Sequence, residues 1–205
     1  MTDILDYSII WKPDFVAPRK PVLIQLNPAA YLAVEGAGEP GGGEFSTKVG
    51  ALYAMAYTIK MTRKFGGRQD YPVSKLEAQW WGPDGQNCFA SVPKAQWRWR
   101  LMIRTPEIVE AKELGSARAA LRKRGKAEGT EYVALHSMTE GQCVQQLHVG
   151  PYETEGETVK QMEGFAHSKG MELCGLHHEI YISDPRRVPP ERIKTILRHP
   201  IQPSK

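Results

Sequence analysis

Apolar residues recur at helical spacing in one segment of the first half of the chain. Five of them follow one another at intervals of three or four residues: Phe45, Val49, Leu52, Ala56 and Ile59. This is the period of a helix with one apolar face. Gly66-Gly67 comes next, and glycine accepts the left-handed backbone that ends many helices. The pattern predicts a helix over residues 45–65.

Short apolar segments on both sides of this helix are typical of strands. Before it, residues 22–26 and 31–34 resemble one strand interrupted at Pro28, since proline marks a bulge or an edge position. After it, residues 76–81 and 97–104 have the length and residue types of two further strands. The first half therefore predicts a β-α-β-β unit.

The same order of elements recurs in the second half. A strand ends at Val149, a helix with apolar residues at helical spacing ends at Gly170, and strands follow at 178–182 and 192–198. Each half also closes on Arg-x-Pro after an apolar strand, at Arg104 to Pro106 and at Arg198 to Pro200. Two related halves predict a pseudo-two-fold body with a ligand site where they meet.

The segment between the halves predicts a connecting helix and a hairpin. Thr105-Pro106 is a good helix start, because threonine caps and proline is tolerated in the first turn, so a helix is expected over about 106–125. Residues 132–136 and 142–147 resemble a hairpin around Glu140-Gly141. The fold class is α+β, with antiparallel sheets covered by helices. We expect one domain over 1–205, with halves at about 20–106 and 130–202.

Composition sets mild limits on function. The chain has 205 residues, 41% hydrophobic and 24% charged, which is enough for a core of its own. A net charge of +4 does not demand a nucleic-acid partner. One basic cluster stands out, and it fits a solvated helix end: Arg118, Arg122, Lys123, Arg124 and Lys126. No direct nucleic-acid binding is expected.

The cysteines and the apolar runs bear on location. The three cysteines, Cys88, Cys143 and Cys174, lack any CxxC spacing, which disfavours a disulfide framework and a structural zinc site. No apolar run approaches the ~20 residues that cross a bilayer. The N-terminus is acidic where a signal peptide is basic. A cytoplasmic protein with no membrane contact is expected.

Two glutamates on predicted strands are the candidate catalytic residues. Strand alternation places Glu77 on one face with Trp81, and Glu179 on one face with His177 and Tyr181. If both faces look inward, two carboxyls share a partly apolar cavity, where burial raises a carboxyl pKa and prepares the group for acid or base chemistry. The alternative for either glutamate is the solvated face of a sheet.

Aromatic residues gather around these glutamates. Flat molecules stack on such rings, and cations bind to their faces. Neighbours Trp80 and Trp81 point to opposite faces, so one of them belongs to the core. The candidate ligand-binding residues are Trp80, Trp81, Trp97, Tyr152, His177 and Tyr181. His177 and His178 project oppositely and cannot hold one metal ion together, so no metal and no organic cofactor is expected.

Several motifs together resemble the GyrI-like small-molecule-binding family. In the second half these are His148-Val149-Gly150-Pro151-Tyr152, Glu179-Ile180-Tyr181-Ile182-Ser183-Asp184-Pro185-Arg186 and Lys194-Thr195-Ile196-Leu197-Arg198-His199-Pro200. In the first half they are Val34-Glu35-Gly36-x-Gly38-Glu39-Pro40, Leu52-Tyr53-x-x-x-Tyr57-x-x-Lys60-Met61 and Leu76-Glu77-x-x-Trp80-Trp81. The resemblance spans about residues 20–202. It implies two β-α-β-β units, GyrI-like or SOUL-like, that face a central ligand groove.

The resemblance is closest to the stand-alone subgroup that includes cyclopropanoid cyclopropyl hydrolases. Those enzymes open the cyclopropane of DNA-alkylating compounds of the yatakemycin and duocarmycin type and so protect the cell. By this resemblance Glu179 matches the groove glutamate of drug-sensing relatives, and Glu77 matches the glutamate of the first-half motif. The chain has Lys75 and Ala78 where the subgroup usually has Pro and Gly around that motif's Leu-Glu.

Two functions follow as expectations. One is a cofactor-independent hydrolase, in which a carboxylate takes a proton from water while a second carboxyl or a phenol stabilises the developing oxygen charge. The other is a binding protein that sequesters or senses flat, hydrophobic or cationic molecules, or contacts a protein such as gyrase. No helix-turn-helix is expected ahead of the first sheet.

Overall fold

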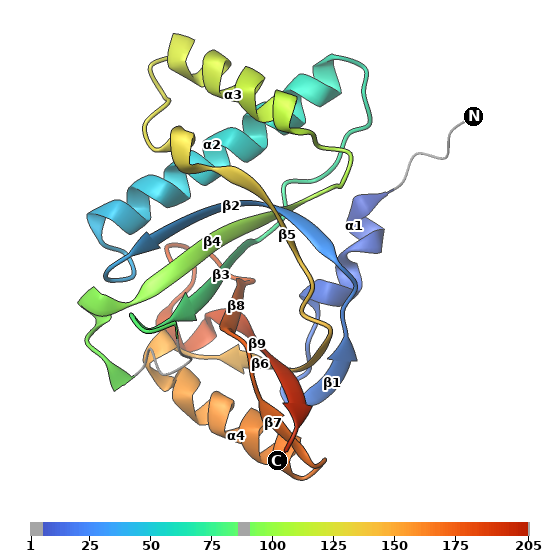
Figure 1. Ribbon diagram of the computed structural model, residues 1–205, viewed down its shortest axis with the longest axis vertical. Coiled ribbons are helices and arrows are strands. Elements are labelled where there is room, and N and C mark those ends of the chain that lie inside the picture. The colour runs from blue at the N-terminus through green and yellow to red at the C-terminus, as the bar shows by residue number, and fades with distance from the viewer. Residues whose placement is uncertain (1–5, 86–90, 205) are drawn as a thin grey trace.

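The computed structural model describes residues 6–85 and 91–204, and a nine-stranded antiparallel sheet forms its centre (Figure 1). The strands are β1 (Val22–Gln25), β2 (Ala29–Ala37), β3 (Leu76–Trp81), β4 (Arg98–Thr105), β5 (Ala134–Met138), β6 (Gln142–Val149), β7 (Met171–Leu173), β8 (His177–Tyr181) and β9 (Lys194–Pro203). Their order is β1-β6-β9-β8-β3-β4-β2-β5, with β7 beside β9. The α-helices are α1 (Tyr7–Ile10), α2 (Gly43–Phe65), α3 (Ala111–Lys123) and α4 (Glu155–His167).

The predicted pair of β-α-β-β units is confirmed. The first is β2-α2-β3-β4, and the second is β6-α4-β8-β9 with the short β7 inserted. The units join through antiparallel pairing of β3 with β8, at the middle of the sheet. The α+β class is thus confirmed, and the junction between the halves is a pair of hydrogen-bonded strands.

Two strand pairings differ from the expectation. β1 and β2 are not one interrupted strand: β1 pairs with β6 of the second unit, whereas β2 pairs with β4 and β5. The predicted hairpin at Glu140-Gly141 is also wrong, because β5 lies against β2 and β6 lies against β1 and β9. The outermost strand of the first unit is thus β5, which precedes the second unit in the chain, and the outermost strand of the second unit is β1, which precedes the first. This exchange of strands ties the two units together.

The connecting helix α3 begins later than Thr105-Pro106 predicts. Its first residue is Ala111, and the preceding Glu110 forms a capping box with Glu113. The two side chains exchange hydrogen bonds with backbone N–H groups that the first turn leaves unpaired. Glu113 also forms a buried ion pair with Arg63 of α2, at 2.9 Å. This double use of Glu113 fixes where α3 starts and how it lies on α2.

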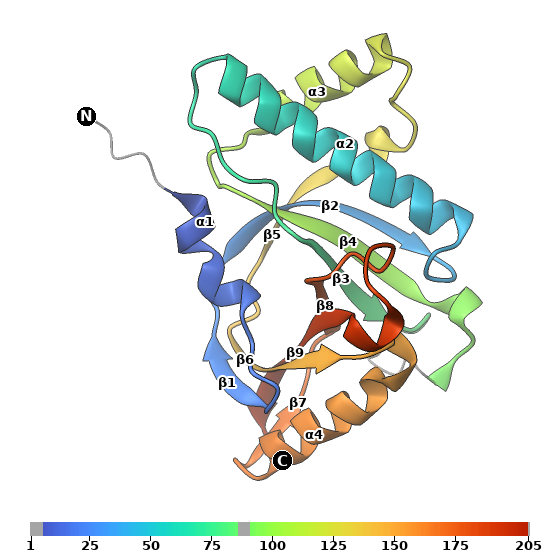
Figure 2. The ribbon, with the colours of Figure 1, turned by 180° about the vertical axis from the view of Figure 1, so that it is seen from behind.

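Both long helices that flank the junction cover the same face of the sheet (Figures 1 and 2). Directly paired residues of an antiparallel sheet point to the same side. The register links one such row across five strands: Val34, Leu101, Ala78, Glu179 and Leu197. Val34, Leu101 and Ala78 pack with α2 in one buried hydrophobic cluster, and Leu197 packs with α4 in another. Glu179 lies between Ala78 and Leu197 in this row and belongs to neither cluster. We call this side the helical face and the other the opposite face.

No helix within the described residues is both long enough and apolar enough to span a membrane.

The close packing of Trp99 on Gly36 in the first unit can be tested by substitution. A Cβ atom at Gly36 would lie 2.2 Å from the fully buried Trp99 ring, so Gly36→Ala is expected to lower the free energy of unfolding by about 1–3 kcal/mol through overpacking. Gly50→Ala is the matched control, because that exposed helical position has open space and alanine favours helix by about 0.5–1 kcal/mol. Urea denaturation compares the two, and equal stabilities would contradict this packing.

Candidate functional site

The register of β3 against β8 decides which candidate residues lie together. Glu77 pairs with Ile180 and Ala78 pairs with Glu179. Glu179 therefore points to the helical face and Glu77 to the opposite face. The expectation that the two glutamates face one groove is wrong. Glu77 is paired with Ile180, the neighbour of Glu179, and neighbouring residues of a strand point to opposite faces. Both side chains are nonetheless buried.

On the helical face, Glu179 belongs to a cluster with Glu155 and His177. One ligating atom from each of the three lies within 4.8 Å of the others, and all three residues are buried. Glu155 comes from the first turn of α4, and the other two come from β8. The His177 Nε2 atom lies 3.2 Å from Glu179 Oε1. We call this set the Glu155–His177–Glu179 cluster.

Burial and mutual repulsion set the protonation of this cluster. Burial, then the neighbouring Glu179 carboxyl, raise the pKa of Glu155 well above its ordinary value. Two carboxyls this close cannot both ionise easily, so Glu155 keeps its proton more readily than an isolated carboxyl does. Burial and the same Glu179 charge also raise the pKa of Tyr181, which stays protonated and able to donate a hydrogen bond.

A second histidine supports His177 from β9. His177 Nδ1 lies 2.7 Å from His199 Nε2, and both rings are buried. Burial and the nearby His177 lower the pKa of His199 to about 3, which keeps its ring neutral at physiological pH. The contact fixes the orientation of His177, so its other nitrogen faces Glu179.

Two tyrosines lie at the edge of the cluster. The rings of Tyr152 and Tyr181 meet edge to face, with centroids 6.1 Å apart. Burial, then the Glu179 charge, raise the pKa of Tyr152 to about 12. Tyr152 is 37% exposed, so it offers ring surface to a molecule that approaches from solvent. The register places His177, Glu179 and Tyr181 on one side, as alternation predicts, and the Tyr152 ring contacts Tyr181 there.

The tryptophans divide between the two faces. Trp80 lies on the helical face, 2% exposed, stacked on Phe45 and edge to face with Trp97. This packing makes Trp80 part of the core. Trp81 lies on the opposite face, where Arg100 lies over its ring at 5.7 Å. Trp81 and Tyr181 therefore cannot wall one groove, and that expectation is corrected.

Glu77 belongs to a buried ion network on the opposite face. The fully buried His178 lies between two carboxylates, with Nε2 3.1 Å from Glu77 Oε2 and Nδ1 2.9 Å from Glu140 Oε1. Arg198 also forms an ion pair with Glu140. Burial alone would lower the pKa of His178, but the Glu140 and Glu77 carboxylates outweigh it and raise the pKa to about 9. His178 and Arg198 outweigh burial at Glu140 and lower the pKa of that carboxyl to about 2. These compensated charges indicate a structural role.

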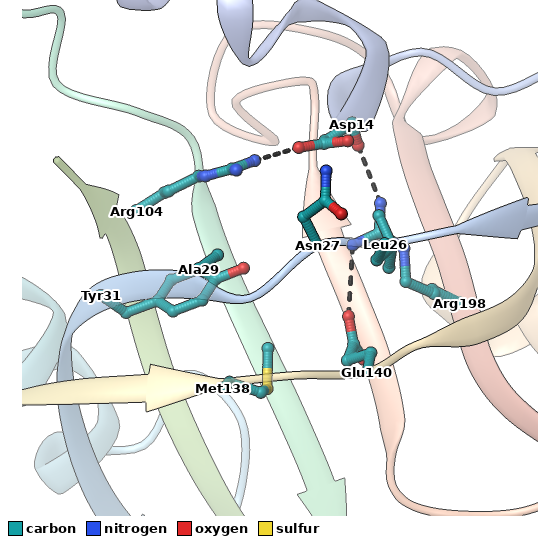
Figure 3. Close-up of a pocket in the computed structure, with 9 residues that line it drawn as sticks. All are labelled: Asp14, Leu26, Asn27, Ala29, Tyr31, Arg104, Met138, Glu140 and Arg198. Atoms are coloured by element: carbon teal, nitrogen blue, oxygen red, sulfur yellow. Dashed lines mark hydrogen bonds and ion pairs between the residues drawn. The ribbon is translucent and has the colours of Figure 1, made fainter. Parts of the chain in front are cut away.

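A small cavity borders this network (Figure 3). Arg104 and Arg198 reach Asp14 there, and Tyr31 and Glu140 also line it. Its volume of about 10 Å³ matches a single water. A flat organic ligand does not fit, so the cavity does not compete with the helical face as a ligand site.

Sequence reasoning missed Glu155 and His199. An acidic residue in a first helical turn usually just complements the helix dipole, so Glu155 carried no distinct pattern. Its spacing after Gly150-Pro151-Tyr152 was the available clue, because this turn leads the chain from β6 back over the sheet.

Comparisons with known proteins agree with this architecture. The family described as GyrI-like small molecule binding domain matches residues 101–202. A conserved protein from Listeria innocua has 36% identity and a TM-score of 0.88, over 97% of this chain and all of that one. A second structure from the same organism, described as a hydrolase, has 36% identity and a TM-score of 0.86 over the same shares. No curated protein has a significant sequence match to the chain.

A more distant structure shares only the fold. The C-terminal domain of EcmrR has 8% identity and a TM-score of 0.57, over 90% of this chain and 98% of that one. Taken with the family match and the Listeria relatives, the fold defines a small-molecule-binding domain. The chain belongs to the GyrI-like family.

Proposed function

We propose that the protein hydrolyses the strained cyclopropane ring of DNA-alkylating cyclopropanoid compounds and so protects the cell. The observation that carries the proposal is the buried Glu179 carboxyl beside the Tyr181 hydroxyl on the helical face, with the Tyr152 ring packed against Tyr181. The 36%-identical Listeria innocua structure described as a hydrolase supports an enzymatic role.

The chemistry uses groups already in place. Water attacks the less hindered cyclopropane carbon, that carbon–carbon bond breaks, and its electron pair flows through the ring to make the carbonyl oxygen a phenolate. The raised pKa of Glu155 favours a proton on that carboxyl, and Glu179 takes the proton that the water loses. A tyrosine O–H stabilises the new phenolate, and the raised pKa values of Tyr181 and Tyr152 keep that proton available.

A second candidate function is capture of hydrophobic cations without turnover. The paired burial of Glu155 and Glu179 favours it, since two carboxyls at 7% exposure each attract positive charge. The same tyrosines would hold the flat part of the cation. The two functions differ in whether the ligand leaves chemically changed.

Paired variants test where the ligand binds and whether it reacts. Tyr152→Ala is expected to weaken binding of a spirocyclopropyl dienone by about 1–3 kcal/mol, the usual loss of an aromatic stacking partner, and to slow its conversion. Trp81→Ala is the control and should change neither, because Trp81 lies on the opposite face. Fluorescence titration gives affinity, and dienone absorbance gives the rate. Loss of binding in Trp81→Ala alone, or unchanged dienone with wild-type protein, would contradict the proposal.

A further inference from the structure

The Glu155–His177–Glu179 cluster has the make-up of a metal centre. Its three donor atoms lie within 4.8 Å of one another. Donors bonded to one Zn²⁺ at about 2.0–2.2 Å lie on the order of 3–4 Å apart, a spacing that small side-chain rotations reach. We propose that Glu155, His177 and Glu179 bind a first-row divalent metal ion such as Zn²⁺. The sequence alone predicted no metal, because His177 and His178 project to opposite sides of their strand.

An unsatisfied atom supports the site. Glu155 Oε1 is buried and has no hydrogen bond of good geometry, although Thr195 and Glu179 lie near the carboxyl group, and the residue is 7% exposed. Within residues 6–85 and 91–204, no lysine or arginine forms an ion pair with Glu155 or Glu179. Buried carboxylates are costly unless a cation or metal compensates them. A divalent ion at the cluster supplies that compensation and occupies the orphaned oxygen.

His199 completes the arrangement as a supporting residue. A metal-bound histidine commonly donates its second ring N–H to a neighbour, which fixes the ring and its tautomer. His199 Nε2 lies 2.7 Å from His177 Nδ1, in position to accept that hydrogen bond. The lone pair of His177 Nε2 then points toward Glu179 and the metal position.

The mixed donor set suits a metal ion. Two carboxylates and an imidazole are ligands that first-row divalent ions accept, and all three residues that supply them are buried. A bound ion would use Glu179 as a ligand and so remove it as a base. Saturating Zn²⁺ is therefore expected to suppress the proposed hydrolysis, although the metal site does not depend on that activity.

Metal titration of the full chain tests the site directly. Chelator-treated protein is titrated with Zn²⁺ by calorimetry and with Co²⁺ by visible absorption. We expect saturable binding of one ion to wild type and to the control Glu153→Gln, which alters an exposed neighbour. Glu155→Gln should weaken binding at least tenfold, and His199→Gln by about 10–100-fold. Cooperative thermal unfolding confirms that each variant is folded.

Two results would overturn the metal site. One is the absence of saturable Zn²⁺ or Co²⁺ binding to folded wild type. The other is equal affinity of wild type and folded Glu155→Gln, which would place the ion at other histidines. Dienone hydrolysis is measured separately on metal-free protein, so failure of the metal site and failure of the hydrolytic proposal give different results.

Discussion

Glu179→Gln is expected to reduce the rate constant for dienone hydrolysis by roughly 10²–10⁴-fold, the usual contribution of a general base. Glutamine keeps the size of the side chain but cannot take a proton from water. Binding of a neutral dienone should change little, because the base acts in the transition state while the tyrosine rings act in both states. Rates under saturating dienone and affinities from fluorescence quenching separate the two effects.

Glu77→Gln is the matched control for this experiment. Glu77 is also a buried strand glutamate, but it faces His178 on the opposite side of the sheet. Its loss should lower stability and leave the turnover of folded protein near that of wild type. A large fall in turnover for Glu77→Gln, or full activity of Glu179→Gln, would show that the wrong face has been assigned.

Stability should fall as pH rises from about 6.5 to about 9, because of His178. Its folded-state pKa is raised to about 9 from the ordinary 6.5. Between these values the folded protein holds a proton that the unfolded chain has released, so the contribution is complete below pH 6.5 and is lost as pH rises through 9. This pKa shift corresponds to a contribution of about 3 kcal/mol to the free energy of unfolding.

His178→Gln isolates this contribution. The variant should be less stable at pH 6 by about 3–5 kcal/mol, since it leaves Glu77 and Glu140 buried without their shared cation. Between pH 6.5 and 9 the free energy of unfolding of the variant should also fall much less than that of wild type. Urea denaturation at a series of pH values gives both numbers. Parallel curves for wild type and variant would mean that His178 does not titrate with a raised pKa.

The sequence predicts the elements of each unit well. Helix α2 and the strands around it have strong periodicity, and the first Arg-x-Pro tail marks where β4 ends. The second tail lies inside β9, which continues to Pro203. Local pattern governs these features, so residues close in the chain suffice to predict them. Within one strand, alternation also placed His177, Glu179 and Tyr181 together correctly.

The relation between the units could not be predicted from such patterns. A shift of one residue between paired strands turns every side chain to the other face, so alternation within β3 and β8 left the relative facing of Glu77 and Glu179 open. The partners of β1 and β5 depend on contacts between the units and carry no local pattern. Glu155 reaches Glu179 only because α4 packs on β6 and β9.

Isotope labelling tests most directly the proposal that this protein adds water across a strained carbon–carbon bond. Pure protein is incubated with a spirocyclopropyl dienone in H₂¹⁸O, and the product is analysed by mass spectrometry. We expect a ring-opened phenol that carries one ¹⁸O atom on the former cyclopropane carbon, formed by wild type and far more slowly by Glu179→Gln. Recovery of bound but unchanged dienone from wild type would contradict hydrolysis and favour capture.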